Sequence, residues 1–326
     1  MLDPQLTREL DALVAATYLL WEPGWVTFNW REYTYDHVQR VRGLALSLAA
    51  RESADRDVVE LAALLHDVTK SYDGEYITDA AGQRIVDANG QWHNLLRAPS
   101  GQNEVTALFD ARALAGTLHN VSGAEVASAL LHRRGVADPL CKHVATTIRD
   151  HLTPPADAAV ESLCLYDADT IDANIGLPAF VRNIYIHLHF YEARNPGARP
   201  LDDLLANAPL DYLQPYVSEK LKPWAQGKLR DFIPRLRTES GRQFARTRLE
   251  RLDATFDRFI EELADPATNL ECGCLAVLLH YMRHRESVSI AAETHCLACD
   301  WPARNGATDS ARTLVQAIER ESAGLE

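Results

Sequence analysis

The chain has 326 residues, of which 47% are hydrophobic and 24% charged, and its formal net charge is −13. This length suits one large domain or a domain with an appendage. The acidic balance argues against a protein that holds duplex DNA through a wide basic face. The sequence shows neither an apolar run long enough to span a membrane nor a secretory signal at its N-terminus, and its six cysteines are too few for a disulfide scaffold. We therefore expect a protein of the reducing cytoplasm.

Helical periodicity dominates the chain and predicts an all-α helical bundle. Local signals mark several helix starts. Asp55 or Asp57 is a typical N-cap residue, Ser122 and Glu125 form an S-x-x-E capping box, and Asp138 is followed by proline. The predicted helices, in chain order, cover 34–52, 57–70, 122–135, 138–151, 157–172, 177–194, 209–224, 238–263, 275–286 and a last stretch from about Thr308.

Two segments interrupt the helical pattern. Residues 72–104 are rich in glycine, and Asn89-Gly90 is a strong turn signal, which predicts a hairpin or ordered loop inserted into the bundle. Such an insertion serves either as a lid or as a solvated excursion. Asp265-Pro266 marks a boundary, so we predict one helical domain over 1–265 and a small C-terminal extension over 266–326.

Histidine and aspartate residues recur along the predicted helices. Imidazole and carboxylate groups suit divalent Mn, Fe, Zn or Co. Two neighbouring metal ions need about six ligands and at least one bridge, and a carboxylate can bridge because it has two oxygens. Adjacent residues of a helix do not point to one spot, but the pair His66-Asp67 can serve two neighbouring metal positions. The full set is His37, His66, Asp67, His119, His151 and Asp169.

The His66-Asp67 pair lies in LAALLHDVTK, with His37 before it and Asp169 after it. In this combination the chain resembles the HD superfamily of metal-dependent phosphohydrolases. The resemblance runs through DHVQRVRGLALSLA, LHNVSGAEVASALL, IRDHL and LYDADTIDANIG. It covers roughly residues 30–265, apart from the glycine-rich insertion, and implies the HD-domain helical fold.

The resemblance implies a metal site with one or two divalent transition-metal ions. Asp169 is preferred to Asp167 because Ala168-Asp169-Thr170-Ile171 matches the Ala-Asp-x-Leu-like context of the family's last ligand. His119 and His151 match the extra histidines of members with a second metal, or else lie at helix ends and orient other ligands. The four core ligands implied are His37, His66, Asp67 and Asp169.

The implied reaction is hydrolysis of a phosphate ester by metal-activated water. Asp67 would bridge or orient, and Lys70 matches the lysine of the common HDxxK pattern and would hold a phosphate oxygen. Arg149 and Arg182 are further candidates for substrate binding, although arginines of this kind are equally typical of a solvated, ion-paired surface.

Four cysteines cluster in the C-terminal extension in the order C-x-C and then C-x-x-C. This order resembles the zinc-binding arrangement of redox-regulated heat-shock chaperones, and four thiolates are the number that a tetrahedral structural zinc site needs. Free thiols and an iron–sulfur cluster are the alternatives, and His295 is a substitute ligand. The cysteines are Cys272, Cys274, Cys296 and Cys299.

The leading functional hypothesis is a hydrolase acting on a nucleotide or another small phosphorylated metabolite. The same six ligands also suit an HD-type diiron oxygenase that cleaves a C–C or C–P bond. A third alternative is a non-catalytic nucleotide-binding or regulatory module. The sequence leaves open the substrate, the metal and the number of ions, and it does not decide whether the chain forms an oligomer.

Overall fold

The computed structural model describes residues 2–21, 31–77, 79, 85, 94–95, 98–287, 289–301 and 306–325. Most of these residues are helical, which confirms the predicted all-α class. They form two compact units, Met1–Asp169 and Thr170–Glu326. None of the described helices is both long and apolar enough to cross a membrane. The predicted cytoplasmic location stays a prediction.

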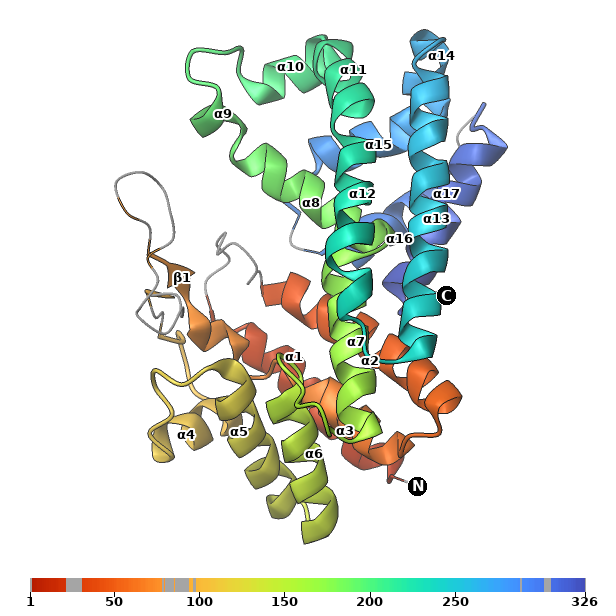
Figure 1. The fold of residues 1–326 in the computed structure, drawn as a ribbon. Helices are drawn as coiled ribbons and strands as arrows, with labels where there is room; N and C mark the ends of the chain where they lie inside the picture. Colours follow the sequence, from red (N-terminus) through yellow and green to blue (C-terminus); the bar gives the residue numbers. More distant parts are fainter. Residues whose placement is uncertain are drawn as a thin grey trace. The chain divides into compact units, whose positions relative to one another are not determined.

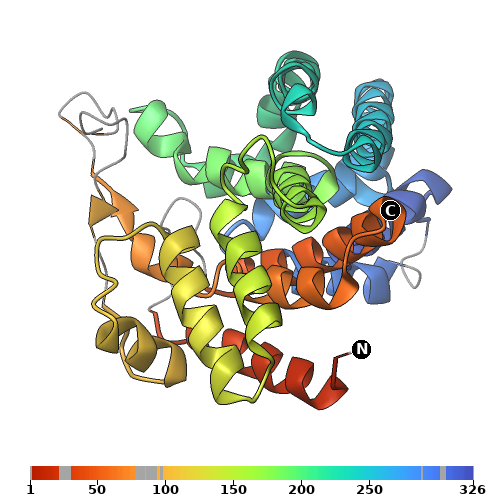
Figure 2. The ribbon, with the colours of Figure 1, turned by 60° about the horizontal axis from the view of Figure 1, so that its bottom comes forward.

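The first unit is a helical bundle with one short hairpin. Helices α5 and α6 pack side by side, and α3 contacts both α2 and α6 (Figures 1 and 2). Its elements are α1 (Pro4–Tyr18), α2 (Arg31–Glu52), α3 (Arg56–Leu65), η1 (Lys70–Asp73), β1 (Glu75–Tyr76), β2 (Asn94–Leu95), α4 (Glu104–Ala111), α5 (His119–Arg133), α6 (Asp138–Asp150) and the first part of α7 (Val160–Asn174).

Helix α3 ends earlier than predicted. Asp55 is its N-cap and accepts the backbone N–H groups of Asp57 and Val58, as expected. The helix stops at Leu65 rather than at residue 70. A physical reason is that the His66 ring binds the Ala63 carbonyl, which the Asp67 amide would need to continue the α-helix. The His-Asp pair therefore lies in tight turns just beyond the helix.

The start of α5 also differs from the prediction. The helix begins at His119 with Leu118 as N-cap, and the predicted Ser122–Glu125 capping box is wrong. Ser122 lies inside the helix, where its buried hydroxyl is 2.8 Å from the Thr69 hydroxyl. This buried hydrogen bond satisfies a side chain that would otherwise be free to cap the helix.

The insertion predicted over 72–104 is described only at its two ends. Strand β1 pairs antiparallel with β2, with Glu75 opposite Leu95 and Tyr76 opposite Asn94. This pairing agrees with a hairpin base. Most of residues 78–97 lie outside the described residues, so a lid function stays a prediction.

The second unit contains more helices than the sequence predicted. The stretch predicted over 177–194 divides into α8 and α9, the stretch over 209–224 breaks at Lys220, and α10, α14 and α16 were missed. The elements are α8 (Leu177–His189), α9 (Tyr191–Arg194), α10 (Leu201–Asn207), α11 (Pro209–Glu219), α12 (Leu221–Asp231), η2 (Ile233–Arg235), α13 (Glu239–Glu262), α14 (Pro266–Cys272), α15 (Cys274–Arg283), α16 (Ile290–Asp300) and α17 (Asp309–Ser322).

The predicted boundary near Asp265-Pro266 coincides with the break between α13 and α14. The second compact unit, however, runs from Thr170 across this break. Compactness therefore divides the chain at a different place from the predicted domains 1–265 and 266–326. That domain division stays a prediction.

A buried charge cluster joins α8, α13 and α17 in the second unit. The Glu321 carboxylate accepts the Leu177 backbone N–H at 2.7 Å and Arg251 Nη1 at 2.6 Å. The Arg248 side chain is fully buried beside it. Gly176 precedes Leu177 with φ 112° and ψ −178°, a conformation essentially restricted to glycine. Residue 176 must therefore be glycine for the backbone to approach the Glu321 carboxylate this closely.

We expect Gly176→Ala to destabilise the protein by about 1–3 kcal/mol from backbone strain alone. A Cβ atom would also lie 2.4 Å from Glu321 Oε2, so the carboxylate would have to move. Gly227→Ala is the matched control, because no heavy atom lies within 4 Å of its added Cβ in helix α12. That change should stabilise by about 0.5–1 kcal/mol. Chemical denaturation measures the free energy of unfolding of both variants, and equal changes in the two would contradict the prediction.

Candidate metal centre

The six predicted ligands lie together in the first unit, although they come from five separate segments. Helix α2 carries His37, and the turn after α3 carries His66 and Asp67. His119 is the first residue of α5, His151 caps the end of α6, and Asp169 lies on α7. All are buried except Asp169, whose side chain is 18% exposed. They are His37, His66, Asp67, His119, His151 and Asp169.

Asp67 lies at the centre of the cluster and faces two groups of histidines. Its Oδ2 atom is 3.6 Å from His37 Nε2 and 3.4 Å from His66 Nε2. Its Oδ1 atom is 3.3 Å from His119 Nε2 and 3.7 Å from His151 Nε2. Within each group all candidate ligand atoms lie within 4.8 Å of one another. One carboxylate thus belongs to two groups of three.

Asp169 extends the first of these groups. Its Oδ1 atom is 3.0 Å from His37 Nε2. Asp167 and Asp172, on the same helix, are buried, and none of the three aspartates belongs to either group of three. The contact with His37 favours Asp169, and its choice as the last ligand stays a prediction.

The backbone and a further carboxylate orient the imidazole rings. His66 Nδ1–H donates to the Ala63 carbonyl at 2.8 Å, and His151 Nδ1–H donates to the Ile148 carbonyl at 2.7 Å. His119 Nδ1 lies 2.5 Å from Asp73 Oδ2. With Nδ1 engaged in this way, the Nε2 lone pair is left for a cation, as in most metal-binding histidines.

Burial and local charge set protonation states that suit metal binding. Burial lowers the pKa of His66, and it lowers the pKa of His151 to about 3, with help from the neighbouring histidines. Burial alone would raise the pKa of Asp67, but His66 and Lys70 outweigh it and hold that pKa well below its usual range. His37 likewise outweighs burial and lowers the pKa of Asp169. At neutral pH the imidazoles of His66 and His151 are therefore neutral and the carboxylates of Asp67 and Asp169 charged, which metal ligation requires.

Residues that sequence reasoning missed hold the cluster in place. Asp73 orients His119, and the buried Tyr18 hydroxyl donates to the Asp67 carbonyl at 2.7 Å. The Thr69 hydroxyl binds the His119 carbonyl at 3.2 Å. The only sequence signal for Asp73 is its place three residues after Lys70, since positions three apart share one side of a 3₁₀ helix.

Residues 34–174 match the family model of the HD domain. The chain contains an HD domain over this segment. This match includes all six clustered residues, so the resemblance seen in the sequence is confirmed at the level of the superfamily. No match was found among curated proteins.

Several solved structures are similar to the HD-domain chain at low identity. A predicted HD superfamily hydrolase from an uncultured Thermotogales bacterium is 22% identical, with 78% of this chain and 92% of that chain covered and a TM-score of 0.42. Bacillus subtilis YpgQ in complex with ADP is 18% identical, with 80% and 98% covered and a TM-score of 0.37. At these values the likeness does not extend to activity or ligand.

The clustered residues of the HD domain fit a divalent transition metal. His66 Nε2 and Asp67 Oδ1 are buried and lack a hydrogen-bond partner among the described residues. Such atoms cost free energy unless a ligand satisfies them. A set of neutral imidazoles around ionised carboxylates is the donor set that Zn, Mn, Fe or Co prefers. The geometry can accommodate one ion in either group or one in each.

The three predicted phosphate-binding residues lie in different surroundings. Lys70 Nζ is 2.5 Å from Asp67 Oδ2, and the carboxylates of Asp67 and Asp169 raise the pKa of Lys70 although burial alone would lower it. Arg149 is exposed and binds Glu125 at 3.0 Å. Arg182, in the second unit, donates to the Ala173 carbonyl at 3.2 Å. Lys70 contacts the cluster through Asp67, and the binding roles of all three residues stay predictions.

The structure does not bring the four late cysteines together. Cys274 is buried, Cys272 is half-buried, and Cys296 and Cys299 are exposed on α16. Among the described residues, the candidate metal groups contain no cysteine. His295, the predicted substitute, lies near Cys299 with Nε2 3.7 Å from its Sγ. The predicted four-cysteine zinc site stays a prediction.

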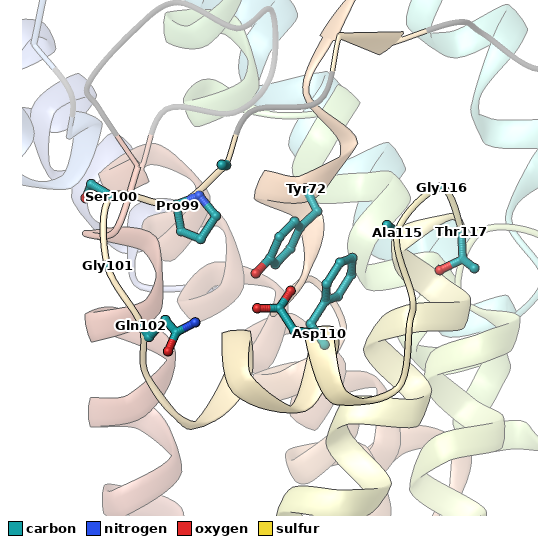
Figure 3. Close-up of a pocket in the computed structure, with 11 residues that line it drawn as sticks. Tyr72, Pro99, Ser100, Gly101, Gln102, Asp110, Ala115, Gly116 and Thr117 are labelled. Atoms are coloured by element: carbon teal, nitrogen blue, oxygen red, sulfur yellow. The ribbon is translucent and has the colours of Figure 1, made fainter.

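A pocket of about 500 Å³ is lined in part by Tyr72 of η1, the 3₁₀ helix that follows the His-Asp pair (Figure 3). Tyr72 stacks on Phe109 with ring centroids 3.7 Å apart, and Trp21 packs edge-on at 5.0 Å. The Tyr72 hydroxyl is buried without a hydrogen-bond partner among the described residues, and Figure 3 shows it beside the Asp110 carboxylate. Other walls come from 98–102 and 115–117. Because η1 also carries Lys70 and Asp73, pocket and cluster share one short element.

Proposed function

We propose that the protein is a metal-dependent hydrolase of phosphate esters, acting on a nucleotide or another small phosphorylated metabolite. The observation that carries this proposal is the double use of Asp67. Its two carboxylate oxygens face two separate histidine pairs within a buried cluster. A purely structural contact would need only one histidine pair beside Asp67. Two neighbouring metal positions need both histidine pairs and a carboxylate that they share.

Each residue of the cluster has a distinct role in this proposal. When bound, a divalent ion supplies a Lewis acid that polarises a phosphoryl oxygen and acidifies a water molecule. His37, His66 and Asp169 hold one position, and His119 and His151 hold the other. Asp67 joins the two, and Asp73 keeps the His119 ring oriented.

Lys70 is the residue proposed to meet the substrate. Its ammonium group lies against Asp67 Oδ2, at the inner edge of the cluster. Once Asp67 ligates an ion, that ammonium can neutralise a negatively charged phosphoryl oxygen instead. Lys70 thus binds and orients substrate, and it adds positive charge where negative charge develops.

The neighbouring pocket supports a small substrate. Its volume of about 500 Å³ lies within the range of metabolite sites. Tyr72 and Phe109 supply an aromatic wall, and the Tyr72 hydroxyl and Asp110 carboxylate supply polar groups. Such a mixture suits a ring-bearing organic group attached to the phosphate. A polymer would need an extended surface rather than a pocket of this size.

The decisive experiment is a screen of phosphate monoesters and nucleotides with metal-free protein and with protein loaded with Mn²⁺, Fe²⁺, Zn²⁺ or Co²⁺. We expect phosphate release that depends on the metal, without oxygen consumption. Oxygen uptake by the iron-loaded protein, with no phosphate released, would favour the diiron oxygenase instead. Metal binding with neither activity would favour a binding module.

A further inference from the structure

A second group of metal-compatible side chains lies in the other compact unit, on α15 and α16 (blue in Figure 1). His280 lies in the last turn of α15, His284 is the residue that caps this helix, and Glu293 lies in the first turn of α16. None of the three was singled out by the sequence patterns, because they belong to no motif. They gather because the end of α15 lies beside the start of α16.

The three side chains are close enough to share one ion. His280 Nε2 is 3.2 Å from Glu293 Oε2. The rings of His280 and His284 stack with centroids 4.0 Å apart, as residues four apart on one helix face can do. One ligand atom from each of the three residues lies within 4.8 Å of the other two. A modest rotation of the side chains would bring them to one point.

The surrounding hydrogen bonds hold this arrangement in place. His284 Nδ1 lies 2.8 Å from the His280 carbonyl, so the ring donates to the backbone and its Nε2 atom is left as a ligand. The buried Tyr281 hydroxyl binds the Thr294 hydroxyl at 2.8 Å and fixes α15 against α16. Ser289 caps α16 by accepting the Ala292 amide at 3.0 Å. Both helix ends are thus set before a ligand binds.

The exposure of the group leaves one side open to water. The side chains of His280 and Glu293 are 24% and 20% exposed, and His284 is exposed. Two imidazoles and one carboxylate, with a fourth position open, form one of the established zinc ligand sets. An ordinary histidine–glutamate ion pair would need only His280 and Glu293. His284 adds a third candidate ligand atom within 4.8 Å of the other two.

We propose that His280, His284 and Glu293 form a further divalent transition-metal site, of the zinc class, which joins α15 to α16. Zinc is favoured by the ligand set, because three nitrogen and oxygen ligands with an open position suit its tetrahedral geometry. The site belongs to the second unit and shares no ligand with the HD cluster. It therefore does not depend on the proposed hydrolase activity.

The test is zinc stoichiometry and affinity of the full chain, measured by equilibrium dialysis and elemental analysis. We expect His284→Ala and Glu293→Gln each to lose one zinc per chain, or to bind it at least about 10-fold more weakly. His143→Ala is the matched control. It removes an imidazole that lies 3.2 Å from Glu161 but has no second histidine beside it among the candidate metal groups of the described residues. The control should bind as much zinc as the wild type.

Unchanged zinc binding in both His284→Ala and Glu293→Gln would overturn the proposal. The group would then be an ordinary ion pair between His280 and Glu293. Zinc lost only with Cys296→Ser would overturn it too, by assigning the ion to the thiols. Co²⁺ distinguishes these sources, because thiolate ligands give intense charge-transfer bands and nitrogen and oxygen ligands do not. Asp67→Asn should leave the α15–α16 ion in place. Loss of metal from the HD cluster is therefore distinguishable from loss of the α15–α16 ion.

Discussion

Asp67→Asn is expected to remove both metal positions of the HD cluster at once and to lower phosphate release at least about 1,000-fold. The amide lacks the charge that a bridging ligand needs, although it has nearly the same shape. Loss of several kcal/mol of charge stabilisation in the transition state corresponds to this factor, at ten-fold for each 1.36 kcal/mol. The measurements are bound metal per chain and the rate of phosphate release with saturating metal.

Two comparison variants test whether Asp67 bridges two metal positions. His119→Ala should lose only the position that it shares with His151, so about half of the cluster's metal remains. Asp138→Asn, which changes an exposed carboxylate paired with Lys142, should keep both ions and full activity. Equal metal loss in the Asp67 and His119 variants would contradict a bridge between two positions. Retention of all metal in Asp67→Asn would refute the proposed centre.

The candidate ligands could be predicted from the sequence because the spaced combination of His37, the His66-Asp67 pair and Asp169 resembles the HD superfamily. His66-Asp67 follows an apolar helix, and the remaining ligands lie at helix ends or on helices with clear periodicity. The sequence could not show that the pair lies just beyond α3, because this depends on the His66 ring binding a backbone carbonyl. That difference matters, since tight turns allow adjacent side chains to point toward one region.

Asp73 could not be assigned from the sequence because its contact is made only in three dimensions. Its carboxylate orients His119, which is 46 residues away along the chain. An aspartate before a glycine is ordinary turn chemistry, so the local pattern favours a turn residue rather than an orienting group. The role follows only from the 3₁₀ helix η1, which places Lys70 and Asp73 on one side.

The four late cysteines do not gather into one candidate metal group among the described residues, and helix formation is the physical reason. The C-x-x-C pair lies on α16, where both thiols are exposed. Cys274 is turned into the core because the Glu262 carboxylate accepts the amides of Cys274 and Leu275 and fixes the start of α15. Spacing alone cannot show whether a cysteine pair lies on a zinc-binding turn or on a helix.

Glu321→Ala is expected to cause the largest loss of stability outside the metal cluster. It would leave the fully buried Arg248 guanidinium without its nearest carboxylate, 3.9 Å from Nε, and the Leu177 amide without its acceptor. Removing one partner of a buried ion pair costs about 3–5 kcal/mol, because the remaining charge is not compensated. In a unit of this size the unfolding midpoint should fall by about 6–20 °C.

Glu319→Ala is the matched control for this change. It removes the same side chain from the same helix, but Glu319 is exposed and lies 3.8 Å from an exposed histidine. Surface pairs of this kind contribute less than about 1 kcal/mol, so the midpoint should move little. Thermal unfolding followed by circular dichroism compares the two variants. If they melt together, the buried carboxylate does not stabilise α8 and α13 as its contacts indicate, and Gly176→Ala should then cost only its backbone strain.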